Sequence, residues 1–161
     1  MQNDAILRQQ LVELLKGGNA HIHFEDAIKD FPTEARGKRP KGAEHSPWEV
    51  LEHLRIALWD ILEFSRNPDH KSPKWPVGYW PATQAPPDAN AWDKSVNTYC
   101  EDLKRLCELV ADEHTNLFAK IPHGDGQNLL REALVAADHN SYHLGEMVLL
   151  RRALGVWHKD A

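Results

Sequence analysis

The sequence contains only two cysteines and no apolar run as long as the roughly 18 residues that indicate a membrane-spanning helix. It also lacks an excess of positive charge, because 24 Asp and Glu outnumber 19 Lys and Arg and give a net charge of −5. Small disulfide-stabilised domains are rich in cysteine, and proteins that bind phosphate backbones present positive charge. We therefore expect no disulfide framework, no membrane association and no nucleic-acid partner.

The two cysteines and the first residues favour a reducing, cytoplasmic location. Cys100 and Cys107 are seven residues apart in one predicted helix, about 10 Å along its axis, whereas a disulfide requires Cα atoms within about 7 Å. The segment from Met1 to Asp4 has neither the basic start nor the apolar stretch of a secretory signal. We expect reduced thiols and a cytoplasmic protein.

What the sequence does have is a globular composition, with 42% hydrophobic and 27% charged residues over 161 positions. This length predicts a single domain that spans residues 1–161. Apolar residues recur at three- and four-residue intervals in four segments, and no alternating strand pattern is found. The predicted helices cover residues 3–16, 47–66, 88–111 and 125–154. An all-α four-helix bundle is the expected fold.

One helix start and one long connection are especially informative. Ser46-Pro47-Trp48-Glu49 combines an N-cap serine, a proline at the first helical position and the glutamate of a capping box. The Pro/Trp-rich segment 67–87, between the second and third predicted helices, is too long for an ordinary loop. Its aromatic residues either line a substrate pocket or cap the core, and both interpretations remain open: Trp75, Tyr79 and Trp80.

Ten histidines are the unusual feature of the composition. His139 and His143 are four residues apart on an apolar face of the last helix, and His53 has an apolar setting in the second helix. A single buried imidazole is easily satisfied by one hydrogen bond, but three would each lose hydration in a core. One divalent cation at about 2.0–2.1 Å would satisfy all three.

The remaining seven histidines are expected at the surface, in loops or at helix ends. These are His21, His23, His45, His70, His114, His123 and His158. His23 follows a helix break and is the one most able to fold over the mouth of the bundle.

Two stretches, residues 46–54 (SPWEVLEHL) and 137–146 (ADHNSYHLGE), make the chain similar to the DinB/YfiT-like superfamily of metal-binding four-helix bundles. The resemblance implies an up-up-down-down topology and frequent homodimers. It also implies one divalent metal, nickel or zinc, bound by His53, His139 and His143. Relatives include transferases that use low-molecular-weight thiols and proteins assigned as metal-dependent hydrolases, and the resemblance does not choose between these activities.

Three imidazoles leave coordination positions open for water or substrate, as in catalytic metal sites. A metal-dependent hydrolase or thiol-dependent transferase acting on a small molecule is thus the leading hypothesis. The alternative is a non-catalytic binding or stress-response module that the metal only stabilises. Candidate carboxylates for base catalysis are Glu49 and Asp60, with Glu146 as a further one, although each is also explained as a capping or solvated residue.

Overall fold

The structure is a computed structural model that describes residues 2–157, and all of its regular elements are helical. Within these residues there are five α-helices, two short 3-10 helices and no strand. They are α1 (Gln2–Lys16), α2 (Phe24–Ile28), η1 (Thr33–Ala35), α3 (Pro47–Arg66), η2 (Val77–Tyr79), α4 (Ala91–Ala111) and α5 (Leu129–Ala153). The predicted all-helical class is confirmed.

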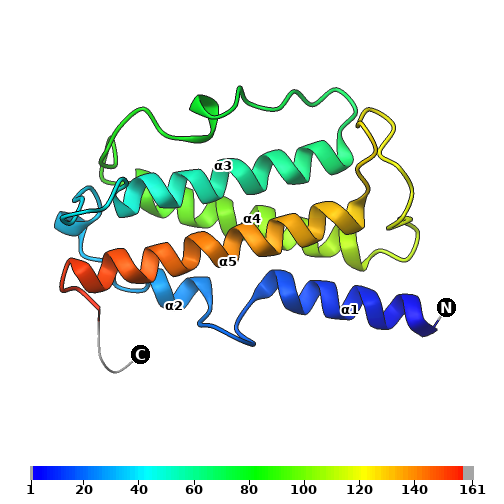
Figure 1. Ribbon diagram of the computed structural model, residues 1–161, viewed down its shortest axis with the longest axis horizontal. Coiled ribbons are helices and arrows are strands. Elements are labelled where there is room, and N and C mark those ends of the chain that lie inside the picture. Colours follow the sequence, from blue (N-terminus) through cyan, green and yellow to red (C-terminus); the bar gives the residue numbers. More distant parts are fainter. Residues whose placement is uncertain (1, 158–161) are drawn as a thin grey trace.

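The four long helices lie side by side, with α3 packed against both α4 and α5, and α1 against α4 and α5 (Figure 1). In Figure 1, α1 and α5 run in one direction and α3 and α4 in the other. The order along the chain is therefore up-down-down-up, and the expected up-up-down-down order is corrected. The cause is the connection 67–90, which returns along the whole bundle before α4 begins, so that α3 and α4 are parallel.

Local sequence determines where α3 begins, as predicted. The Ser46 hydroxyl accepts a hydrogen bond from the backbone N–H of Glu49, and the Glu49 carboxylate accepts one from the backbone N–H of Ser46. This reciprocal pair is a capping box, and Pro47 occupies the first helical position where it sacrifices no hydrogen bond. The helix then continues to Arg66 and contributes five core side chains that are fully buried: Val50, Leu51, Leu54, Leu58 and Leu62.

The start of α5 differs from the prediction, whereas its end agrees with it. Asn128 is the N-cap, with its side-chain oxygen accepting from the Arg131 N–H at 2.9 Å. The expected start at Asp125-Gly126 is wrong, because Gly126 has a φ of 122° and belongs to a turn closed by the Ile121 N–H to Gln127 C=O hydrogen bond. At the other end Gly155, with a φ of 71°, terminates the helix as a left-handed cap.

Two arginines buried in this fold satisfy the backbone carbonyls at helix ends. Arg8 on α1 donates to carbonyls in the last turn of α4 and just after it, and Arg151 on α5 donates to carbonyls at the end of α2 and just after it. Both arginines are buried, with exposed fractions of 5% for Arg8 and 2% for Arg151. They link helices whose last turns would otherwise have carbonyl groups without donors.

Cys100 and Cys107 are free thiols in the described part of the chain, as predicted. Burial raises the pKa of Cys100 to about 11, so this thiol is protonated and unreactive at neutral pH. Among residues 2–157, none of the helices is both long enough and apolar enough to span a bilayer.

Candidate metal centre

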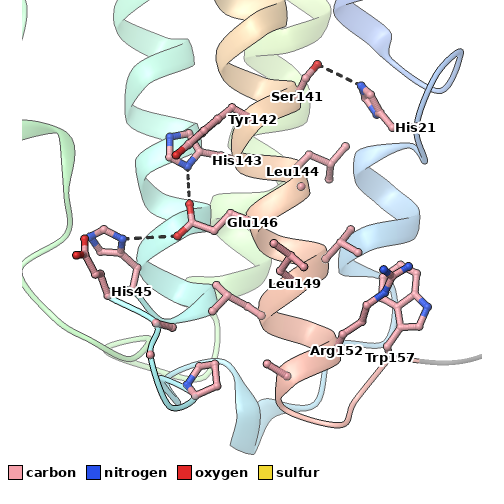
Figure 2. A pocket seen from close by; sticks show the side chains of 18 of the residues that line it. His21, His45, Ser141, Tyr142, His143, Leu144, Glu146, Leu149, Arg152 and Trp157 are labelled. Carbon is pink, nitrogen blue, oxygen red and sulfur yellow. Dashed lines mark hydrogen bonds and ion pairs between the residues drawn. The ribbon is translucent and has the colours of Figure 1, made fainter.

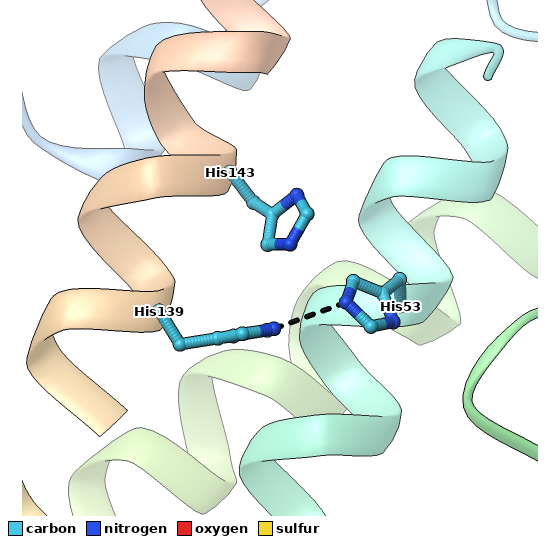
Figure 3. Close-up of side chains that lie close together, drawn as sticks. All are labelled: His53, His139 and His143. Atoms are coloured by element: carbon cyan, nitrogen blue, oxygen red, sulfur yellow. Dashed lines mark hydrogen bonds between the residues drawn. The ribbon is translucent and has the colours of Figure 1, made fainter. Parts of the chain in front are cut away.

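The three predicted histidines meet between two helices, α3 and α5 (Figure 3). His53 comes from α3, and His139 and His143 come from successive turns of α5. One nitrogen from each ring lies within 4.8 Å of the others. The Nε2 atoms of His53 and His139 are 3.0 Å apart, a separation compatible with two ligands of one ion at metal–nitrogen distances of about 2.0–2.1 Å.

The outer nitrogens of two of these rings are fixed by hydrogen bonds. His53 Nδ1 lies 2.8 Å from the backbone carbonyl oxygen of Tyr79, and His143 Nδ1 lies 2.8 Å from Oε2 of Glu146. Both partners are acceptors, so each Nδ1 carries the proton and each Nε2 presents a lone pair to the centre. Ligand histidines in metalloproteins are oriented in this way.

Electrostatics favours the neutral form of two of the three histidines, His53 and His139. Burial lowers the pKa of His53 below its ordinary value. Burial together with the neighbouring rings of His143 and His53 lowers the pKa of His139 to about 4. Because only the neutral imidazole binds a metal, protons do not compete for these nitrogens at neutral pH.

The centre also contains a buried polar atom that the protein leaves without a partner. His139 Nδ1 makes no hydrogen bond to any described residue. When His53 carries its proton on Nδ1, its Nε2 can only accept a hydrogen bond. His139 must then donate from Nε2, and its Nδ1 remains a buried acceptor without a donor. The alternative is that both Nε2 atoms are ligands. Neutral rings, converging lone pairs and this incompletely satisfied histidine fit a divalent metal ion.

Trp80, from the long connection, covers one side of the centre. Its ring stacks on His53 at 4.0 Å between centroids and 4° between planes, and on its other face it stacks on His45 at 3.8 Å and 11°. His45 was expected at the surface, but it is half-buried in this sandwich. No local pattern predicts this position, because the stacking depends on the return of the loop across α3.

Glu146 lies between His45 and the candidate ligand His143 (Figure 2). While Oε2 of Glu146 accepts from His143, Oε1 lies 3.6 Å from Nδ1 of His45. The hydrogen bond from His143 lowers the pKa of Glu146, so this carboxylate is ionised at neutral pH. Of the three carboxylates considered from the sequence, Glu146 is the one hydrogen-bonded to a candidate ligand.

The carboxylates of Glu49 and Asp60 are engaged elsewhere. Glu49 accepts from the Ser46 N–H and forms an ion pair with Arg39. Although burial alone would raise its pKa, these hydrogen bonds lower it. Asp60 accepts from His70 Nε2 at 2.7 Å and from the Tyr79 hydroxyl at 2.5 Å. Glu49 therefore caps the start of α3, and Asp60 binds two residues of the long loop.

The three aromatic residues of the loop have different positions. Trp80 borders the centre, and Tyr79 contributes its carbonyl to His53 and its hydroxyl to Asp60. Trp75 is 71% exposed and contacts the edge of Tyr79 at 5.4 Å between centroids. The structure brings Tyr79 and Trp80 to the histidines but leaves Trp75 outside.

The other predicted surface histidines mostly lie where expected. His21, His23, His114 and His123 are exposed, and His23 makes no side-chain cap at the start of α2. His70 contradicts the prediction, because only 5% of its side chain is exposed and it is hydrogen-bonded to Asp60. His158 lies outside the described residues.

A groove of about 1100 Å³ extends from the metal centre along the outer face of α5. His143, Glu146 and Trp80 line it near the centre, and Figure 2 places Arg152 and Trp157 at the opposite end. Its wall includes exposed apolar side chains, with Tyr142 74% and Leu149 65% exposed. The groove is large enough for a small organic molecule.

Comparison with protein families agrees with this geometry. The family model described as DinB superfamily matches residues 23–147, which include all three histidines. The chain therefore belongs to the DinB superfamily, and the resemblance of the two sequence motifs is confirmed. Comparisons with curated proteins and with solved structures gave no significant match.

Proposed function

We propose that this protein is a metal-dependent enzyme, a hydrolase or a low-molecular-weight-thiol-dependent transferase, with one divalent ion held by His53, His139 and His143. The observation that carries the proposal is that His143 is both a member of the cluster and part of the groove wall. A substrate in the groove would therefore reach a centre with only three protein ligands, and such centres keep positions open for chemistry. Nickel and zinc are the metals we expect.

A divalent metal in such a site would act as a Lewis acid toward water or a thiol at neutral pH. The protein itself supplies orientation. Tyr79 fixes the ring of His53 through its carbonyl, and Glu146 fixes the ring of His143 through Oε2. Trp80 covers one face of His53 and excludes water there.

We assign the acid–base role to Glu146. Its Oε1 is not the atom that accepts from His143, and it faces His45 at the groove. His45 Nδ1 lies 3.6 Å from this oxygen, which is too long for a direct hydrogen bond, so a proton taken up by Glu146 would reach solvent through water in the groove. Glu49 is less suited to this role because its carboxylate already accepts hydrogen bonds from Arg39 and Ser46. Asp60 is less suited because its carboxylate accepts from His70 and Tyr79.

The groove favours a small substrate with an apolar portion. Tyr142, Leu149 and Val148 offer apolar surface beside the polar atoms of Glu146 and His143. Ligand sites commonly combine an apolar wall with a few polar groups that fix orientation.

Turnover against a panel of esters, amides and thiol–acceptor pairs tests the proposal. Metal-loaded protein should act on at least one member, and His139→Ala should lose this activity. His114→Ala is the matched control, because His114 is exposed and outside the cluster. Activity that survives both His139→Ala and complete metal removal would contradict the mechanism.

A cobalt-substituted sample separates an enzyme from a module that the metal only stabilises. A small anion or thiol should change the visible spectrum of cobalt if coordination positions are open. A spectrum that no added ligand alters, together with no turnover, would favour the non-catalytic alternative.

A further inference from the structure

The long connection between α3 and α4 is attached to α3 at a second place, two helical turns beyond His53. There the Asp60 carboxylate accepts from His70 Nε2 at 2.7 Å and from the Tyr79 hydroxyl at 2.5 Å. His70 also places the edge of its ring against Trp59, with 4.9 Å between centroids. Both donors come from the loop, so one carboxylate holds two distant points of it. We call Asp60, His70 and Tyr79 the loop clamp.

Two members of the loop clamp are well protected from water. The side chains of His70 and Asp60 are 5% and 13% exposed. Burial, together with the hydrogen bond to Asp60, raises the pKa of Tyr79, so the phenol keeps its proton and remains a donor at every physiological pH. Hydrogen bonds to an ionised acceptor are about twice as strong as neutral ones.

Tyr79 connects the loop clamp to the metal centre. Its hydroxyl is held by Asp60, while its backbone carbonyl accepts from His53 Nδ1 at 2.8 Å. The next residue, Trp80, stacks on the same His53 ring with only 4° between planes. Residues 79 and 80 thus supply the acceptor for the outer nitrogen of His53 and cover one face of its ring.

We infer that the loop clamp is a positioning device that sets the affinity of the metal centre. By fixing Tyr79, it keeps the proton of His53 on Nδ1 and directs the Nε2 lone pair toward His139 and His143. This inference rests on the proposed metal site. Asp60 therefore acts through Tyr79 and His53 and has no contact with the substrate.

The size of the effect follows from the behaviour of outer hydrogen bonds in metal sites. Loss of a partner that orients a ligand histidine typically weakens metal binding 10- to 100-fold. The Tyr79 hydroxyl is one contact further from the ligand, so we expect about a tenfold loss, at the lower end of that range. Part of the loss would come from ordering the loop anew when the metal binds.

The test compares Tyr79→Phe with Tyr99→Phe. Tyr79→Phe removes only the hydroxyl, and Tyr99 is a buried tyrosine that packs against Phe24 and not against the histidines. Competition with a chelator gives zinc and cobalt affinities. We expect about tenfold weaker binding and an altered cobalt spectrum for Tyr79→Phe, and wild-type values for Tyr99→Phe. Wild-type affinity and spectrum in Tyr79→Phe would overturn the inference.

A measurement on the metal-free protein keeps this test separate from the proposed function. Nitrogen NMR of the histidine rings reports which nitrogen carries the proton. His53 should be protonated on Nδ1 in the wild type and should become a mixture of tautomers in Tyr79→Phe. An unchanged tautomer would overturn the positioning role of the loop clamp. Failure of the wild type to bind any metal would overturn the proposed function and with it the effect on affinity, but the tautomer of His53 would still show whether the loop clamp orients this ring.

If Tyr79→Phe does not fold, Asp60→Asn replaces it. The amide keeps the size of the side chain and one acceptor oxygen but lacks the charge, so we expect the same changes to a smaller extent. Identical metal affinity and His53 tautomer in this variant would then overturn the inference.

Discussion

Two groups of buried polar side chains in this bundle differ in how completely they are satisfied. Arg151 is 2% exposed, and its guanidinium donates to the carbonyls of Ala27, Lys29 and Val156 at 2.8, 2.6 and 3.1 Å. Arg8 is 5% exposed and likewise donates to three carbonyls around the end of α4. These arginines have partners in the fold itself.

The three histidines are the opposite case. The protein supplies acceptors for the outer nitrogens of His53 and His143, and the Nε2 atoms of His53 and His139 lie 3.0 Å from each other. His139 Nδ1 has no partner among residues 2–157. Buried groups that stabilise a fold are normally hydrogen-bonded, and exceptions gather at functional sites. The comparison teaches that the hydrogen-bonding groups of the arginines are used by the fold itself, whereas those of the histidines are incompletely used and could hold a metal ion.

The strongest test of this difference removes a guanidinium. Arg151→Met should reduce the free energy of unfolding by about 4 kcal/mol, because several buried carbonyls lose a charged donor and each costs about 1–3 kcal/mol. Urea denaturation measures the change. Arg152→Met is the control, since Arg152 is exposed and its loss should cost less than about 0.5 kcal/mol. Equal effects of the two substitutions would refute the structural role of Arg151.

Removing a histidine should have the opposite pattern. His139→Leu should leave the metal-free protein as stable as the wild type or slightly more so, because a partly satisfied polar group is replaced by an apolar one. With metal at 100 times its dissociation constant, the wild type should gain about 2.7 kcal/mol and the variant almost nothing. Unfolding curves with and without zinc measure both quantities. Metal stabilisation of equal size in both proteins would disprove the site.

How far the sequence could reveal these features depends on how local they are. The start of α3 was predictable because Ser46, Pro47 and Glu49 interact within one turn. His139 and His143 could be paired from the sequence because residues four apart lie about one helical turn from each other. His53 could be predicted as the third candidate ligand from its apolar neighbours and from the superfamily motif. Each of these signals is carried by residues that lie within a few positions of one another in the chain.

The missed features depend on the path of residues 67–90. His45 is half-buried against Trp80, and the side chain of His70 is buried against Asp60, because the loop brings these residues together. The same return of the chain makes α3 and α4 parallel and so changes the expected order of directions. No local sequence pattern encodes where an irregular loop crosses a helix. These contacts therefore could not be predicted from the sequence.

Asp102 on α4 sharpens the comparison, because it is incompletely satisfied and lies outside the site. It is 2% exposed, and its Oδ2 has no partner in the described chain. Burial raises its pKa, although Arg105 partly opposes the shift. Between the unfolded and the raised folded pKa the folded state binds more protons, so stability falls as pH rises through this window, and the ionised form is destabilising above it.

Asp102→Asn should therefore stabilise the protein by about 1 kcal/mol at pH 7, since it removes a buried charge and keeps the shape of the side chain. Near pH 3, where both the folded and the unfolded carboxyl groups are protonated, the difference should shrink toward zero. Urea unfolding at the two pH values measures it. A destabilised variant at pH 7 would show that the carboxylate has a role that the described contacts do not reveal.

The smallest effect is expected at Trp75, the aromatic residue of the loop that the structure leaves outside the centre. Because it is 71% exposed and touches Tyr79 only at the ring edge, Trp75→Ala should change the free energy of unfolding by less than about 0.5 kcal/mol. Its zinc affinity should equal that of the wild type, whereas Trp80→Ala should weaken binding because it uncovers the face of His53. Chelator competition on both variants measures the difference. A comparable loss in Trp75→Ala would mean that the whole loop, and not only residues 79 and 80, holds the histidine in place.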